Sequence, residues 1–163
     1  MLQDHEERIL RNPGLGAAAC WHFAAQYGEH AKGSPPLLPH FYLAMAILHH
    51  RASVEKLYRM QFDSGIAKAI AEQPDIVAGL QQRLESRADN TLAALQVATS
   101  SGLLQREGGP GFPSFRALGG SLPPSIRHAE GGTSQIYAAA RRLGAFFAAE
   151  PLAALSRQLM IEF

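Results

Sequence analysis

The segment LLPHFYLAMAILHH, residues 37–50, carries an apolar or aromatic side chain at nearly every position. A helix with one apolar stripe covers a core, whereas a helix that is apolar on all sides is buried from several directions. We therefore expect this segment to form a helix that is either the centre of the core or packed against another subunit. Leu38, Phe41, Tyr42 and Met45 are predicted to be buried.

Helices are predicted on both sides of this segment. Asn12 caps the backbone N–H groups of a first helix, and Pro13 needs no N–H at the first helical position, so a helix is expected from there to about Glu29. Thr133 or Ser134 is the expected cap of a later helix, and residues 51–53 are expected to form a turn. Apolar residues at helical spacing predict further helices over about residues 65–72, 76–84, 91–101, 133–149 and 152–160.

The sequence after Gly102 predicts strands and a turn instead of helices. Residues 103–106 and 112–118 predict two short strands around a turn-rich stretch, and Pro113 confines the second strand to a sheet edge. The expected fold class is mainly α: a compact helical domain with a winged-helix-like β-hairpin near residues 103–118 and a C-terminal helical segment. The expected organisation is a loosely ordered segment 1–11, the winged-helix-like domain 12–118, a Gly/Pro-rich loop 119–132, and C-terminal helices 133–163 packing on the domain.

Composition and charge exclude several kinds of protein. The 15 Lys and Arg residues against 14 Asp and Glu give a net charge of +1 over 163 residues, which excludes a polyanion-binding tail. The single Cys excludes a disulfide within the chain and a Cys-based zinc or iron–sulfur site. No apolar stretch is long enough to span a bilayer, and the charged N-terminus lacks the apolar core of a signal peptide. We therefore expect a cytoplasmic protein.

Few residues are charged. They make up 18% of the chain, below the roughly 25% of typical soluble domains. Either a partner covers part of the surface, or an Ala-rich helical protein exposes Gln, Ser and Ala in place of charges.

The sequence contains no recognisable catalytic, cofactor-binding or metal-ligating pattern. His49 and His50 are adjacent and would point about 100° apart on a helix, so they cannot chelate one ion together. His22 falls on the apolar face of the first predicted helix and is expected to be a core or interface residue. Cys20 lies two positions from His22 on divergent helix faces, which disfavours a catalytic pair. No phosphate-binding GxxxxGK[ST] motif occurs, so we expect the protein not to be an enzyme.

Two arginines of the predicted hairpin are candidate phosphate contacts. Arg106 and Arg116 would lie on facing strands, where a winged hairpin can touch a nucleic-acid backbone. The preceding helix, residues 91–101, contains no Lys or Arg, whereas recognition helices direct basic or amide side chains at base edges. The hairpin is therefore interpreted as a protein-docking element rather than a sequence reader.

Five aromatic residues are candidates for a partner interface, because aromatic side chains are favoured interface anchors. Burial in the core of the monomer would explain them equally well. These residues are Trp21, Phe41, Tyr42, Phe146 and Phe147.

Several short segments, in order, resemble one family. They are NP at 12–13, WHF at 21–23, PLLP at 36–39, SGI at 64–66, QPD at 73–75, GLL at 102–104 and ARRLGAFFA at 140–148. Their order and spacing resemble the middle component of bacterial three-component ABC-ATPase systems, the group that includes Lamassu-type antiphage defence. The resemblance covers about residues 12 to 160.

The resemblance implies a non-catalytic accessory subunit without a cofactor. Such a subunit would bridge an SMC/Rad50-like ABC ATPase and an effector nuclease in an antiphage or anti-plasmid defence complex. It would contact DNA only within that complex and would have no membrane partner. Three alternatives remain: a winged-helix DNA-binding transcription regulator, a small hydrolase using Cys20, and a scaffold unrelated to ABC systems.

Overall fold

The computed structural model describes residues 12–119, 123–124 and 131–163. These residues form eight α-helices, one short 3₁₀-helix and a two-stranded antiparallel sheet, which confirms the mainly helical fold with one hairpin. Residues 1–11 and most of the predicted loop 119–132 lie outside the described residues.

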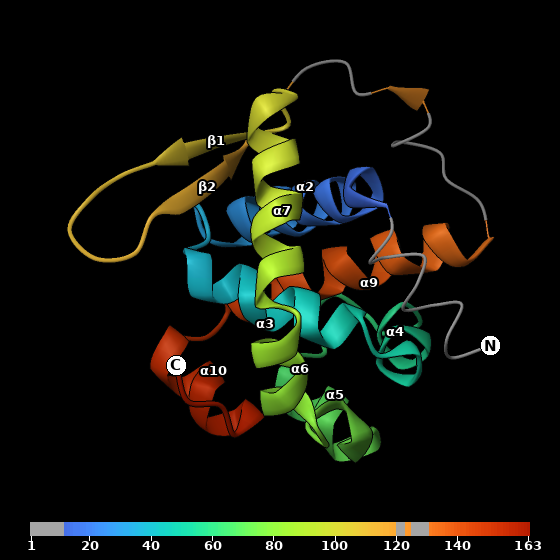
Figure 1. Ribbon diagram of the computed structural model, residues 1–163. Helices are drawn as coiled ribbons and strands as arrows, with labels where there is room; N and C mark the ends of the chain where they lie inside the picture. The colour runs from blue at the N-terminus through green and yellow to red at the C-terminus, as the bar shows by residue number, and fades with distance from the viewer. Residues whose placement is uncertain (1–11, 120–122, 125–130) are drawn as a thin grey trace.

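Helix α2 (Pro13–His30) lies at the centre of the molecule, with Asn12 Oδ1 accepting from the Leu15 N–H at 3.1 Å as its cap. Helix α9 (Gly131–Ala148) packs along one side of it and forms the most extensive helix pair, while α7 (Ala88–Ser100) crosses another side (Figure 1). A Cβ on Gly144 of α9 would lie 2.5 Å from the Phe23 carbonyl oxygen of α2. The two backbones can approach this closely only because residue 144 has no side chain.

Helix α3 (Leu38–Leu48) is buried from several sides, as the apolar segment predicted. Phe41 is 0% and Met45 2% exposed, while Leu38 and Tyr42 are half-buried. The Phe23 ring packs edge-on against Phe41 at 5.3 Å and against Phe147 at 5.6 Å, a geometry that aromatic rings prefer. One aromatic cluster therefore joins α2, α3 and α9.

His40 is a buried polar residue in this core. Its Nδ1 accepts the Leu37 backbone N–H at 2.9 Å and so closes the first turn of α3. Burial lowers the pKa of His40 from 6.5 to about 4, so the imidazole is neutral at pH 7.

The shorter elements cover the lower part of the molecule in Figure 1. They are α4 (Arg51–Leu57), α5 (Ile66–Glu72), the 3₁₀-helix η1 (Pro74–Ile76), α6 (Leu80–Ser86) and α10 (Leu152–Leu159).

Three local expectations were wrong. Residues 76–84 do not form one helix, because η1 ends at Ile76 and α6 begins only at Leu80 after a turn. Residues 51–53 begin α4 rather than form a turn, with His50 Nδ1 and Ser53 Oγ 2.7 Å apart across its first turn. Thr133 and Ser134 already lie inside α9, so neither caps it.

The hairpin follows α7. Gly102, at φ 82°, ends the helix, with the Leu103 N–H donating to the Ala98 carbonyl at 2.9 Å. Strands β1 (Leu104–Glu107) and β2 (Ser114–Ala117) then pair antiparallel, with Arg106 opposite Phe115. The hairpin projects beyond the helical body (Figure 1).

We expect Gly144→Ala to lower the free energy of unfolding by about 3 kcal/mol, because the added methyl meets backbone that cannot move without displacing α2. Gly28→Ala is the matched control within α2: its Cβ would meet nothing within 4 Å, and alanine should stabilise the helix by about 0.5–1 kcal/mol. Urea denaturation of the two variants measures both values. Wild-type stability of Gly144→Ala would contradict the close crossing.

We expect the protein to lose stability as the pH falls from 6.5 to 4. In this window the unfolded protein protonates His40 and the folded protein does not, so the free energy of unfolding falls by up to about 3 kcal/mol. His40→Gln, which keeps a hydrogen-bond acceptor, should flatten this dependence in urea titrations at several pH values. Identical pH profiles for the two proteins would show that His40 does not carry the effect.

Candidate binding surfaces

The structure separates the five candidate interface aromatics into two groups. Phe41, Phe146 and Phe147 are at most 1% exposed, so a partner cannot reach them in this conformation. For these three residues the correct explanation is burial in the core. They are buried because an interior lined by alanine-rich helices needs large side chains to fill its gaps.

Trp21 and Tyr42 are half-buried and stay candidates for a partner contact. The Trp21 Nε1–H donates to the Leu118 carbonyl at 3.1 Å, which ties α2 to the residues directly after β2. Burial and the nearby Asp89 raise the pKa of Tyr42, so its phenol stays protonated.

A cluster that the sequence did not predict lies between α2 and α9. Arg141 Nη1 is 3.4 Å from Nδ1 of the buried His22, and the His22 ring is 4.6 Å from that of Tyr137. A guanidinium has only donors, so the His22 nitrogen is the acceptor in this contact. His22 is thus the core histidine that its place on the apolar face predicted.

The hairpin arginines differ in their surroundings. Arg116 Nε donates to Glu107 Oε1 at 2.7 Å, and its Nη1 donates to the Gly33 carbonyl at 2.5 Å. Arg106 is exposed and has no ion-pair or hydrogen-bond partner among the residues that the structure describes. Arg116 is thus engaged within the protein, and the phosphate contact stays a prediction that fits Arg106 better.

The hairpin is fixed to the connection between α2 and α3. Pro113 accepts the Leu38 N–H at 2.9 Å, and the Phe115 N–H donates to Pro36 at 3.1 Å. The Phe115 side chain is buried, edge-on to Phe41 at 5.4 Å. Residues 36–38 therefore extend the edge of β2 and hold the hairpin in one orientation.

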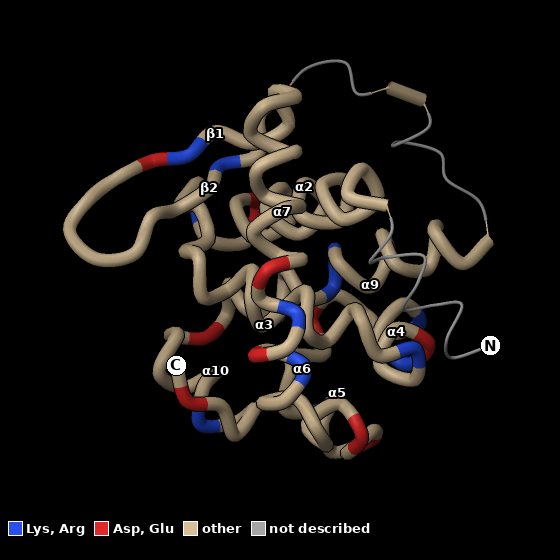
Figure 2. Tube along the Cα trace, in the orientation of Figure 1, with Lys and Arg blue, Asp and Glu red and all other residues tan. Residues whose placement is uncertain are grey.

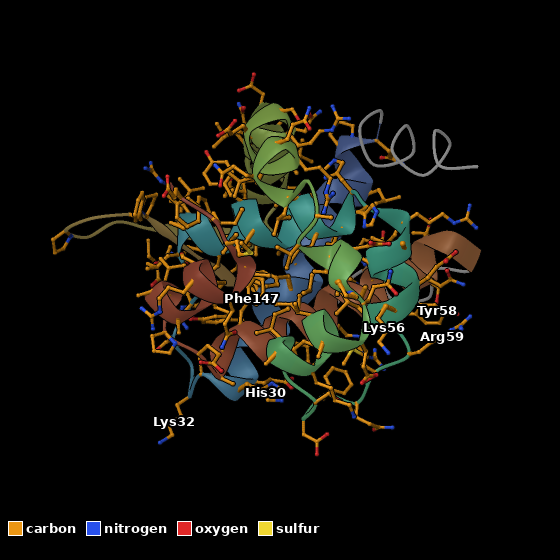
Figure 3. All side chains as sticks on the ribbon, turned by 90° about the horizontal axis from the view of Figure 1, so that it is seen from below. His30, Lys32, Lys56, Tyr58, Arg59 and Phe147 are labelled. Atoms are coloured by element: carbon orange, nitrogen blue, oxygen red, sulfur yellow. The ribbon has the colours of Figure 1, made fainter. Side chains whose placement is uncertain are left out.

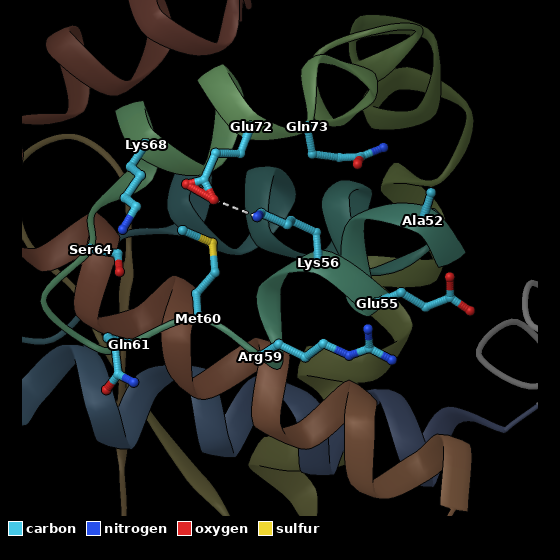
Figure 4. Close-up of a pocket in the computed structure, with 10 residues that line it drawn as sticks. All are labelled: Ala52, Glu55, Lys56, Arg59, Met60, Gln61, Ser64, Lys68, Glu72 and Gln73. Atoms are coloured by element: carbon cyan, nitrogen blue, oxygen red, sulfur yellow. Dashed lines mark hydrogen bonds and ion pairs between the residues drawn. The ribbon is translucent and has the colours of Figure 1, made fainter.

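A cavity of about 520 Å³ lies between α4, α5 and the loop that joins them (Figure 4). Met60 is one of its apolar lining residues, while Lys56, Lys68 and Glu72 give it charge. Lys56 Nζ lies 2.6 Å from Glu72 Oε1, and this hydrogen bond lowers the pKa of Glu72. Acidic and basic groups lie side by side here, an arrangement suited to a polar protein surface of mixed charge.

The cavity and the hairpin lie on different sides of the molecule. Seen from below, the hairpin extends to one side, and Lys56, Tyr58 and Arg59 lie on the other (Figure 3). Between them, α7 carries Asp89 as its single charged residue (Figure 2). Charged residues lie on the hairpin, on α9 and around the lower helices (Figure 2).

The single thiol is inaccessible. Cys20 is 1% exposed, and burial raises its pKa to about 12, so it stays protonated. Among the residues that the structure describes, no group of three or more His, Cys, Asp or Glu side chains comes together as a metal site. Within the same residues, no helix combines the length and apolar character needed to cross a membrane.

Comparison with known proteins identifies the family. No curated protein and no solved structure matches this sequence. The family model described as ABC-three component (ABC-3C) system Middle Component 3 matches residues 2–163. Because this match spans nearly the whole sequence, the chain belongs to the Middle Component 3 family of ABC-three component systems.

Proposed function

We propose that this middle component is a non-catalytic accessory subunit that bridges two other components of its system. The partners are an SMC/Rad50-like ABC ATPase and an effector nuclease, in a cytoplasmic Lamassu-type complex that acts against phages or plasmids. Family membership implies partnership with the other components. One observation supports the bridging role: the cavity and the hairpin differ in chemistry and lie on separate sides of the molecule.

The two surfaces suit simultaneous binding. The hairpin ends in the uncharged residues 108–112, whereas the cavity between α4 and α5 is lined by both cations and carboxylates. A partner with an apolar binding site gains little affinity at the charged cavity, and a charged partner gains little at the uncharged hairpin. One component can therefore occupy each side without competing with the other.

The helix pair α2–α9 connects the surfaces. Helix α2 contacts β2, and Trp21 holds the residues that follow this strand. Helix α9 contacts α4 and α5, and its Arg142 Nε donates to the Met60 carbonyl at 3.1 Å. A closely packed pair moves as a unit, so a displacement imposed at one surface reaches the other. This provides a mechanical route from an ATPase rearrangement to the effector.

The chemistry of single residues supports a non-catalytic role. The Cys20 thiol is protonated and out of reach, which disfavours a hydrolase built on it. The pairing of Arg116 with Glu107 leaves Arg106 as the hairpin cation able to meet phosphate, which disfavours an independent DNA-binding regulator.

Co-expression with the neighbouring genes tests the proposal. Native mass spectrometry of the purified protein should show a stoichiometric complex with both other components. Pairwise mixing should give a binary complex with each of them. A protein that stays monomeric or homodimeric beside its neighbours, and that shifts DNA in a salt-dependent way, would contradict the proposal and support the regulator.

A charge reversal in the cavity tests the two-surface model. Lys68→Glu places a carboxylate beside Glu72 and should weaken the binary complex with one component several-fold while leaving the other unchanged. Arg157→Glu, a charge reversal at an exposed position of α10, is the matched control and should affect neither complex. Equal weakening of both complexes by Lys68→Glu would show that the partners share one surface.

A further inference from the structure

The apex of the hairpin presents one aromatic side chain. Residues 108–112, Gly-Gly-Pro-Gly-Phe, are all exposed and uncharged, and Phe112 is 53% exposed. Gly111 has a φ of 92°, which residues with a side chain rarely adopt, so the bend next to Phe112 depends on a glycine. The apex reaches away from the helices (Figure 1), and its glycines leave Phe112 as its largest side chain.

The chain directly after Phe112 is tied to the helical core. The next residue, Pro113, accepts the Leu38 N–H at 2.9 Å, and Phe115 packs on the fully buried Phe41 of α3. Arg116 adds a bond from Nη1 to the Gly33 carbonyl. The segment that follows the apex is thus tied to the core. A docking group that is ordered before binding loses little conformational freedom when it binds.

Charge at the hairpin indicates the class of partner. The Glu107 carboxylate lies at the base of the apex and is paired with Arg116, so Arg106 is the remaining positive charge of the two strands. Nucleic-acid backbones are bound by several cations together, and membrane surfaces by larger apolar faces flanked by cations. An uncharged apex with one aromatic ring instead fits an apolar pocket on a protein, where aromatic residues provide much of the binding energy.

We propose that residues 108–112 form a docking knob whose Phe112 ring inserts into an apolar pocket of another component of the same ABC-three component system. This inference rests on the proposed function and assigns the hairpin surface its anchor residue. It differs from the cavity between α4 and α5, where charged groups line the contact.

The test uses the full-length protein and the two other components of its system, each purified separately. Calorimetry measures the affinity of the wild type, Phe112→Ala, Phe112→Leu and Phe163→Ala for each component. Phe163 is the matched control, because it is a similarly exposed phenylalanine (57% against 53%) at the C-terminus.

Phe112→Ala should weaken binding to one component by about tenfold or more and leave the other affinity unchanged. Phe112→Leu, which keeps apolar bulk, should lose less, and Phe163→Ala should bind both components as the wild type does. All variants should unfold at the wild-type temperature, because the two substituted side chains are exposed.

Three results would overturn the inference. If the wild type binds both components and Phe112→Ala binds each of them with wild-type affinity, the docking knob is wrong while the bridging function stands. If the wild type binds neither component, both proposals fail. If Phe112→Ala instead abolishes salt-dependent binding to duplex DNA, the apex contacts nucleic acid and not a protein pocket.

Discussion

The close crossing of α2 and α9 at Gly144 determines how the other helices pack. A side chain there would meet the backbone of α2 at 2.5 Å, so the helix axes can approach only with hydrogen at this position. That approach places Phe23 against Phe147 and Phe41, which in turn buries α3. On the α7 side of α2, a Cβ on Gly16 would lie 3.0 Å from Ala94 Cβ. Small residues thus allow α9 and α7 to pack closely against α2.

The same helix pair positions the two features proposed to bind partners. Trp21 of α2 reaches the end of the hairpin, and Arg142 of α9 reaches the loop that lines the cavity. Arg142 also lies over the Phe62 ring at 4.4 Å, a cation–π contact that strengthens this connection. In the proposed function, this rigid central pair relates an ATPase on one side to an effector on the other. Few charged residues are then needed on the surface, since the partners would cover much of it.

Local patterns predicted the parts of the fold that local physics determines. The largely apolar residues 37–50, the Asn12 cap and the Gly102 helix end each predicted the observed element, and the family was confirmed as an ABC-three component middle component. Long-range packing was not predictable. Phe146 and Phe147 would bury the same apolar area in a core or against a partner. The sequence therefore could not distinguish core residues from interface residues. The support of β2 by residues 36–38, and the cavity between α4 and α5, depend on segments brought together only by folding.

Hydrogen exchange of the protein alone and within the assembled three-component complex distinguishes one partner-binding surface from two. If the protein bridges two components, assembly should protect amides in two separate places, the hairpin at residues 104–118 and the cavity segment at residues 52–73. Helices α2 and α9 should stay as protected as in the free protein. Protection confined to one of these places would contradict the bridging role. Exchange that increases along α2 and α9 would contradict their role as the rigid connection.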